Sequence, residues 1–180
     1  AVSGGASVTA SFNGTTLTSG AVAPTVTGYV NVTAASAVPV VAVNGANVNI
    51  AALNLTAGND YSLLVWGDAT APQTTLVSDD LHLPSSSGVK MRLINALETS
   101  AALSLAADYA SVTDNLAQGQ ASAFTTLAQS TLNDLQVTTG SAVLYDDNNT
   151  LTLMAQGVYS VFMFGTPTPS GARFVLRKER

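Results

Sequence analysis

The stretch LNLTAGNDYSLLVWG at residues 53–67 returns as LTLMAQGVYSVFMFG at residues 151–165. Residues that are identical 98 positions later are Leu53, Leu55, Ala57, Tyr61, Ser62 and Gly67. Trp66 aligns with Phe164, so both copies have a large aromatic side chain at that position. Self-similarity of this extent indicates a tandem repeat of one fold.

Upstream of this stretch the two copies lie 95 residues apart, because residues 28–30 align with residues 123–125. A chain of 180 residues is long enough for two small domains or one large one. We expect a first repeat at residues 1–82, a Pro-, Ser- and Gly-rich linker at 83–88, and a second repeat at 89–180.

The local signals within the first repeat are those of β-strands. Residues 8–12 alternate between apolar and polar types and lead into Asn-Gly at residues 13–14, which is a hairpin signal. Residues 38–43 and 48–53 flank a second Asn-Gly turn and predict a second hairpin. The apolar run at 61–66 predicts a strand that is buried on both faces. Short strands with frequent turns are typical of an Ig-like β-sandwich.

One part of the second repeat favours helix when it is considered alone. Residues 100–118 and 122–137 are rich in Ala, Leu and Gln. The aligned residues 6–32 are rich in Thr, Val, Gly and Asn and cannot form a long helix. Because two copies of one fold share their elements, we expect β-structure in both repeats.

The composition excludes several classes of protein. Charged residues make up 9% and hydrophobic residues 47%, which excludes a disordered chain. The net charge of −5 disfavours binding to nucleic acid, since phosphate would be repelled. No cysteine is present, which excludes disulfides, thiolate metal sites and cysteine nucleophiles. No apolar run is long enough to span a membrane, and the first residues do not have the pattern of a signal peptide.

The charges are unevenly distributed along the chain. Residues 1–89 contain no Lys or Arg. The acidic assembly candidates of the front part are Asp60, Asp68, Asp79 and Asp80, and the basic ones at the end are Arg173, Arg177, Lys178 and Arg180. The basic residues either form a solvated C-terminal strand that protects a sheet edge, or a basic tail that docks on the acidic front half of another copy.

Catalytic and metal-binding signals are weak. His82 is the only histidine and lies in the expected linker, with no nucleophile pattern around Ser85, Ser86 or Ser87. Asp146, Asp147 and Asn148 are a weak calcium candidate, although such clusters are also typical of β-turns. We therefore expect a protein that is not an enzyme and that needs no cofactor.

The chain resembles the bacterial cell-envelope family known as domain of unknown function 4397. The resemblance rests on MRLINA at residues 91–96, on Gly28-Tyr29-Val30, and on the Ala-Gly-x-x-Tyr-Ser stretch that ends at Trp66-Gly67. It implies exported proteins, often lipid-anchored, with Ig-like or transthyretin-like sandwiches and no associated enzymatic activity. No lipid-attachment cysteine is present in this sequence.

The first repeat departs from the second at its start. Ala1 aligns with Ala96, so nothing corresponds to residues 91–95, the first strand of the second repeat. A sandwich without that strand exposes backbone groups and apolar core unless something covers them. Three explanations are open. The sequence is truncated upstream of this strand, or another chain supplies the strand, or the sandwich of the first repeat is completed in a different way.

These observations lead to one expected function and one alternative. The first is a structural subunit of a bacterial cell surface or periplasm, which polymerises with copies of itself into an extracellular fibre by β-strand complementation. The alternative is an envelope adhesin that binds carbohydrate or protein through loops at the ends of the sandwich, such as residues 146–149.

Overall fold

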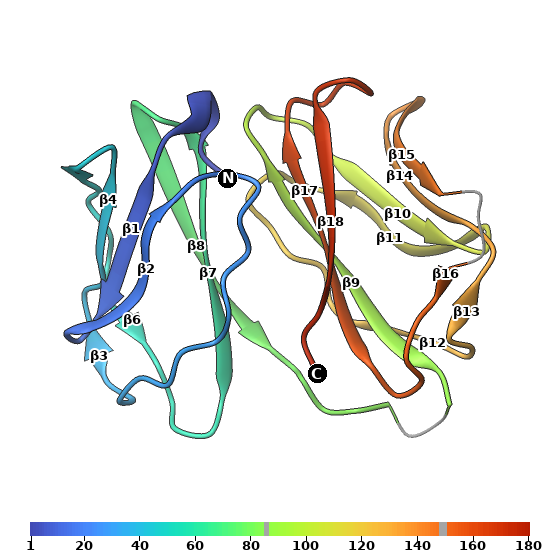
Figure 1. Ribbon diagram of the computed structural model, residues 1–180, viewed down its shortest axis with the longest axis horizontal. Helices are drawn as coiled ribbons and strands as arrows, with labels where there is room; N and C mark the ends of the chain where they lie inside the picture. Colours follow the sequence, from blue (N-terminus) through green and yellow to red (C-terminus); the bar gives the residue numbers. More distant parts are fainter. Residues whose placement is uncertain (85–86, 148–150) are drawn as a thin grey trace. The chain divides into compact units, whose positions relative to one another are not determined.

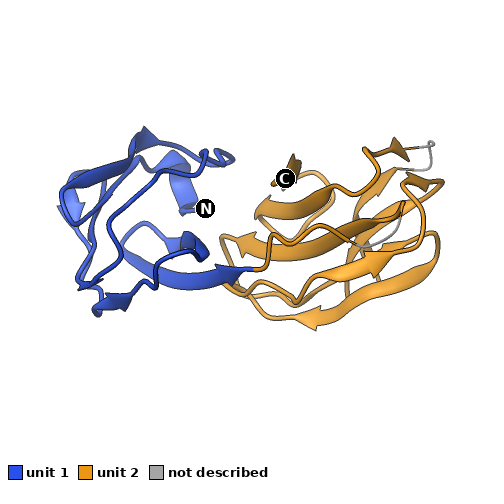
Figure 2. Ribbon diagram, turned by 90° about the horizontal axis from the view of Figure 1, so that it is seen from below, with its two compact units in different colours: residues 1–79 blue, residues 80–180 orange. Residues whose placement is uncertain are grey.

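The computed structural model describes residues 1–84, 87–147 and 151–180. The protein is all-β, as the sequence predicts, and its only helical segment among these residues is the short 3-10 turn η1 (Ser3–Gly5). The chain divides into two compact units, Ala1–Asp79 and Asp80–Arg180 (Figure 2).

The first unit contains three sheets (Figure 1). The largest has the order β2-β1-β4-β5, and the others are the pairs β3-β6 and β7-β8. Their bounds are β1 Val8–Phe12, β2 Thr15–Ala21, β3 Ser36–Ala37, β4 Val40–Val43, β5 Ala46–Asn47, β6 Leu53–Asn54, β7 Asp60–Asp68 and β8 Ala71–Asp79.

The second unit contains two four-stranded sheets, with the orders β11-β10-β14-β15 and β12-β9-β17-β18, and the pair β13-β16. Their bounds are β9 Val89–Leu97, β10 Leu103–Ala107, β11 Ala110–Leu116, β12 Thr125–Leu127, β13 Thr131–Leu132, β14 Leu135–Thr139, β15 Ala142–Asp147, β16 Leu151–Thr152, β17 Val158–Gly165 and β18 Ala172–Lys178.

The repeat found in the sequence is a repeat of structure. β1, β2 and β3 recur 95 residues later as β10, β11 and β13, and β6 recurs 98 residues later as β16. The repeated tyrosine has the same role in both copies: the hydroxyl of Tyr61 accepts a hydrogen bond from the Thr56 amide, and that of Tyr159 from the Met154 amide, at 3.2 and 2.9 Å. This recurrent bond explains why a tyrosine occupies both positions.

The segments that looked helical are β-strands. β10, β11 and β14 lie in residues 100–118 and 122–137, despite the Ala and Leu content there. Pairing across the sheet overrides the helical propensity of these residues, because tertiary contacts outweigh a preference of a fraction of a kilocalorie per residue.

Two local predictions in the first unit need correction. The hairpin predicted around Asn44-Gly45 is present, but its second arm is β5 (Ala46–Asn47), directly after the turn, and not residues 48–53. β7 is not buried on both faces, because Tyr61, Ser62 and Leu63 are only partly buried. Its counterpart β17 is buried from Val158 to Phe164.

The difference between β7 and β17 comes from a missing neighbour. β17 lies between β18, which is antiparallel to it, and β9, which is parallel to it. Within the described part of the first unit, β7 pairs with β8 alone, and the chain joins its other side only through an isolated parallel bridge between Val2 and Gly67. The equivalent pair in the second unit is Leu97 and Gly165, at the end of β9.

The first unit therefore lacks a counterpart of β9 among its described residues, as the alignment of Ala1 with Ala96 predicts. It also lacks a counterpart of β12, the strand that pairs with the other side of β9. β9 and β12 depend on each other for hydrogen bonds, so the absence of one explains the absence of the other.

Each unit has its own apolar core. In the second unit the core includes Met91 and Leu93 of β9 and Val161 and Met163 of β17, all fully buried. The first unit has a smaller core, to which β7 contributes Val65. Val2, 1% exposed, belongs to this core and attaches the start of the chain to it.

Candidate strand-docking site

The second unit shows what the β9 position requires. All nine residues of β9 are buried, although three of them, Lys90, Arg92 and Asn95, carry strongly polar side chains. Polar groups at such positions need partners inside the protein, because burial without hydrogen bonds costs several kilocalories per mole.

Arg92 contacts residues from two neighbouring segments. Its Nε donates a hydrogen bond to Ser160 Oγ on β17 at 2.8 Å. Its guanidinium lies over the ring of Phe124, 4.4 Å from the ring centroid, just before β12. Arg92 therefore connects the two strands that flank β9.

Asn95 lies on the opposite face of β9 from Arg92, because side chains alternate along a strand. Its Nδ2 donates to the carbonyl oxygens of Ala101 and Leu116, at 2.8 and 2.9 Å. Its Oδ1 accepts a hydrogen bond from the Leu97 amide at 3.3 Å. Asn95 thereby attaches β9 to the open end of the β10–β11 hairpin, just before β10 begins and where β11 ends.

The first unit holds the counterparts of the Arg92 partners. Tyr29 corresponds to Phe124, and Ser62 corresponds to Ser160. Both hydroxyls donate to Asp79 Oδ2, each at 2.7 Å. Asp79 ends β8 and is only 6% exposed. A buried carboxylate thus lies between the two residues whose counterparts hold Arg92.

The surroundings of these three residues are partly exposed. Tyr29 is 40% exposed and Val30 is 43% exposed, whereas their counterparts in the second unit, Phe124 and Thr125, are partly buried. We call the side of residues 60–64 that faces away from β8 the outer edge of β7. Along it, no strand pairing is present among the described residues of the first unit.

The four acidic candidates have different roles. Asp60 begins β7 and is exposed. Asp68 ends β7 and accepts hydrogen bonds from the Thr70 amide and hydroxyl at 2.8 and 2.7 Å, which lower the pKa of its carboxyl group. Asp79 accepts a hydrogen bond from Ser62, one of the residues of β7 that form its outer edge.

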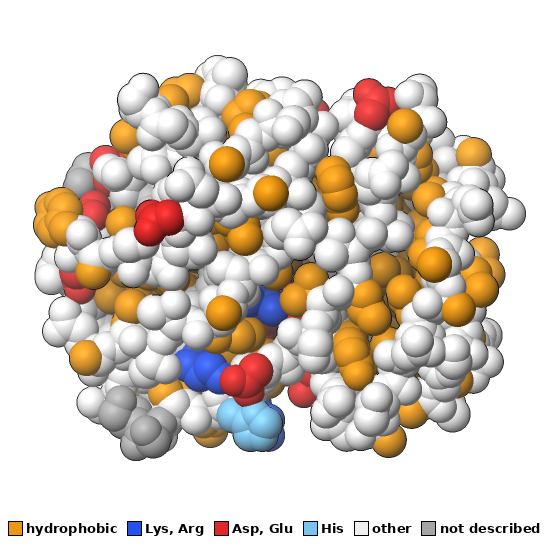
Figure 3. All heavy atoms as spheres, turned by 180° about the vertical axis from the view of Figure 1, so that it is seen from behind, with side chains coloured by type: hydrophobic (Ala, Val, Ile, Leu, Met, Phe, Trp, Pro, Cys, Tyr) orange, Lys and Arg blue, Asp and Glu red, His pale blue; other side chains and the backbone are white. Residues whose placement is uncertain are grey.

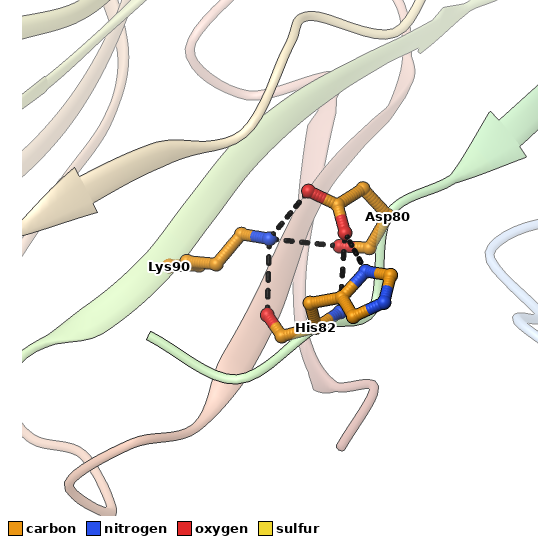
Figure 4. A network of polar contacts seen from close by, with 3 residues as sticks. All are labelled: Asp80, His82 and Lys90. Atoms are coloured by element: carbon orange, nitrogen blue, oxygen red, sulfur yellow. Dashed lines mark hydrogen bonds and ion pairs between the residues drawn. The ribbon is translucent and has the colours of Figure 1, made fainter. Parts of the chain in front are cut away.

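Asp80 begins the second unit, where it forms a compact network with Lys90 and His82 (Figure 4). Lys90 Nζ lies 2.7 Å from Asp80 Oδ2 and donates to the backbone carbonyls of Asp80 and His82, at 3.1 and 3.0 Å. The Lys90 ammonium and then the His82 ring lower the pKa of the Asp80 carboxyl. His82 is 95% exposed and lies 2.6 Å from Asp80 Oδ1. The network attaches residues 80–82 to β9, which is a structural role.

The basic residues near the C-terminus do not form a free tail. Residues 172–178 form β18, an edge strand paired with β17 along its length. Arg173 donates to the Ser170 and Ala172 carbonyls, Arg177 lies 3.0 Å from Glu179, and Lys178 lies 3.2 Å from the Met154 sulfur. These residues are therefore mostly part of an edge strand and not of an extended tail, while their docking on another copy stays a prediction. Arg180 follows β18 and is exposed.

The calcium candidate is not assembled in the described residues. Asp146 and Asp147 end β15, where Asp146 faces Gln136 and Asp147 accepts from the Tyr145 hydroxyl. Asn148 lies outside the described residues. No group of three or more His, Asp or Glu suited to a metal ion occurs in the part of the chain that the structure describes.

Sequence reasoning missed the residues that matter most at this site: Tyr29, Ser62, Arg92 and Asn95. A signal for two of them was present, because an Arg and an Asn interrupt an otherwise apolar strand at residues 91–96. The pairing of Tyr29 and Ser62 with Asp79 joins residues 50 and 17 positions apart, and no local pattern encodes it.

The comparison with known families agrees with this architecture. A family described as "Domain of unknown function (DUF4397)" matches residues 1–106, which is more than half of the 180 residues. The chain belongs to this family. The match covers the first unit and continues through β9 into β10 of the second. No curated protein shows a significant match to the chain, and the described residues include no helix with the length and hydropathy of a membrane span.

Proposed function

We propose that this member of the DUF4397 family is a non-catalytic, exported structural protein of the bacterial cell surface. In this proposal, copies of the chain assemble head to tail into a fibre. The outer edge of β7 in one copy accepts an extended strand from its neighbour. The observation that carries the proposal is the parallel strand β9, which completes the second unit and has no counterpart among the described residues of the first.

The surface composition supports a structural role. Only 9% of the residues are charged, and in the face shown in Figure 3 most side chains are hydrophobic or uncharged. An unpaired strand edge next to apolar surface is a template for pairing with another chain. Contacts between different surfaces of identical copies extend into filaments when the rotation from copy to copy does not close a ring.

The test is the mass of the purified chain in solution over a wide range of concentration, together with electron microscopy at neutral pH. We expect concentration-dependent association and regular filaments. Leu63→Pro should abolish the filaments. The Gly67 amide donates to the Ala1 carbonyl and the Val65 carbonyl accepts from the Ala1 amino group, so the backbone groups of these residues point away from β8. The amide of Leu63, two residues before Val65, points the same way, and proline removes the amide hydrogen that a docked strand would need. Circular dichroism checks that this variant folds. A wild-type chain that stays monomeric at every concentration would rule out the fibre.

A second candidate function is a binding module, and one residue favours it. Tyr109 is 87% exposed at the tip of the β10–β11 hairpin, with a φ of +63°. The same turn in the first unit has Gly14, with a φ of +79°. A bulky residue in this left-handed region is strained, and such strain is concentrated at functional sites.

The turn that carries Tyr109 is firmly attached to its surroundings. Asp108 accepts hydrogen bonds from the Asn133 amide at 2.6 Å and from Gln129 Nε2 at 3.0 Å, and these bonds lower its pKa. An exposed aromatic ring is suited to the apolar face of a saccharide. A glycan array probed with wild type and Tyr109→Gly tests this candidate: a signal unaffected by the substitution would reject it.

A further inference from the structure

The three methionines of the chain lie in two opposite environments. Met91 on β9 and Met163 on β17 are fully buried in the core of the second unit. Met154 lies in the turn between β16 and β17 and is 63% exposed. Peroxides oxidise thiols and thioethers, and their access to the sulfur atom controls the reaction. Since the chain has no cysteine, Met154 carries its most accessible sulfur atom.

The turn around Met154 is fixed by its backbone and not by the methionine side chain. The Met154 amide donates a hydrogen bond to the Tyr159 hydroxyl at 2.9 Å. The Met154 carbonyl accepts one from the Gly157 amide at 3.0 Å. Because both backbone groups are bonded, a chemical change at the sulfur atom leaves the turn intact.

Lys178 lies beside the Met154 sulfur. Its Nζ donates a hydrogen bond to Sδ at 3.2 Å. Lys178 is exposed at the end of β18, where it is opposite Tyr159. A thioether sulfur is a weak acceptor, whereas the oxygen of a sulfoxide carries partial negative charge and accepts strongly from an ammonium group. The contact therefore becomes stronger when the sulfur gains an oxygen atom.

The first unit keeps the same turn but not this pair of side chains. Thr56 corresponds to Met154, and its amide bonds to the hydroxyl of Tyr61 in the same way. Ser78 is opposite that tyrosine, at the position that Lys178 takes in the second unit. The fold of the repeat therefore requires neither the thioether nor the ammonium group at these two positions.

The exposed sulfur and the adjacent ammonium group suit one reaction. We propose that hydrogen peroxide oxidises Met154 to the sulfoxide and that Lys178 binds the oxygen atom that is gained. A sulfur lone pair attacks one peroxide oxygen, so that an S–O bond forms while the O–O bond breaks. The proton on the attacked oxygen moves to the departing oxygen, which leaves as water. Sulfur loses an electron pair, and the peroxide is reduced.

The folded protein should tolerate this modification. A sulfoxide at Met91 or Met163 would place a polar oxygen in the apolar core. At Met154 the oxygen is accessible to water and within reach of Lys178. The exposed position also allows a methionine sulfoxide reductase to restore the thioether with a thiol reductant, so the modification is reversible.

The first test is mass spectrometry of peptides from the folded chain after treatment with dilute hydrogen peroxide at neutral pH. We expect one added oxygen atom, on Met154, at a rate about tenfold or more above that of Met91 and Met163. In the chain unfolded in urea, which is the control for intrinsic reactivity, all three should react alike. Met154→Leu should remove the fast reaction, and the matched control Met163→Leu should keep it. Equal rates in the folded chain would overturn the inference.

Variants of Lys178 show whether the ammonium group binds the sulfoxide. Oxidation should change the melting temperature more favourably in the wild type than in Lys178→Leu, by about 2 °C, because only the wild type gains a charge-assisted hydrogen bond. Lys178→Arg keeps a cation and should behave as the wild type does. The matched control Arg173→Leu removes the same charge near the start of β18 and should also behave as the wild type does.

Equal responses of Lys178→Leu and Arg173→Leu to oxidation would reject the role of Lys178. The melting curves of the unoxidised variants check that each one folds. Treatment with sulfoxide reductases for both epimers should remove the added oxygen and restore the original melting temperature. An oxygen atom that remains would indicate a different product and contradict the inference. None of these measurements depends on the fibre proposed above.

Discussion

Arg92 and Ser160 lie opposite each other on the parallel strands β9 and β17 and are joined by a hydrogen bond of 2.8 Å from Nε to Oγ. The serine is repeated in the first unit as Ser62, where it donates to Asp79. One repeated residue therefore serves as acceptor for a cation in one unit and as donor to an anion in the other. This exchange of partners is the main chemical difference between the two copies.

Removing Arg92 should strongly destabilise the second unit. Arg92→Ala leaves Ser160 without this donor and creates a cavity beside Phe124, so we expect a loss of about 3 kcal/mol in the free energy of unfolding. Arg173→Ala, at an exposed position near the start of β18, should change it by less than about 0.5 kcal/mol. Urea unfolding followed by circular dichroism measures both, and similar losses would refute the importance of the Arg92 contacts.

Asn95→Leu should lower the free energy of unfolding nearly as much as Arg92→Ala does, although leucine is similar in size to asparagine. The substitution leaves two carbonyls and one amide without their side-chain partner, at an expected cost of about 3 kcal/mol. Gln118→Leu is a graded control, because Gln118 makes one such bond, from Nε2 to the Leu97 carbonyl at 2.8 Å, and should cost about 1 kcal/mol. The same unfolding assay applies. Equal effects of the two substitutions would contradict the assignment.

Tyr109→Gly should stabilise the protein. Glycine adopts a positive φ without steric cost, and the exposed ring of Tyr109 contributes little packing, so we expect a gain of about 1 kcal/mol. The reciprocal Gly14→Tyr should cost about as much in the same turn of the first unit. Thermal unfolding of both variants gives the comparison. If Tyr109→Gly lowered the melting temperature, the ring would have a structural role.

The Asp80–Lys90 pair should make the stability of the folded protein depend on pH in the acidic range. The pKa of Asp80 is lowered on folding, so its contribution is complete above an unfolded pKa of about 3.9 and is lost as the pH falls toward the folded value. Asp80→Asn should therefore lower the melting temperature near neutral pH and matter progressively less below about pH 4. Because Asp80 is 61% exposed, we expect an effect below about 1 kcal/mol. Melting temperatures of both proteins across this range test the prediction, which a constant difference would contradict.

Much of the architecture could be read from the order of residues. The spacing of Tyr61 and Tyr159 revealed the repeat, and the alignment of Ala1 with Ala96 revealed the strand that the first unit lacks. The Asn13-Gly14 turn located the first hairpin between residues 12 and 15. These are local signals, since a turn or a period involves residues that are close in the chain.

Other features depended on contacts between distant residues. The Ala- and Leu-rich residues 100–118 became strands because pairing across the sheet outweighs helical propensity. The basic residues 173–178 became an edge strand because β17 offers them a complete ladder of hydrogen bonds. Neither outcome is visible in a short window of sequence.

The sequence by itself determined an all-β tandem repeat, because turn types and apolar spacing are local properties of the chain. Only the tertiary structure decided which polar groups meet. It brought Arg92 to Ser160, 68 residues away, and Tyr29 and Ser62 to Asp79. The burial of a polar group requires a partner, and the fold, not the neighbouring residues, selects that partner.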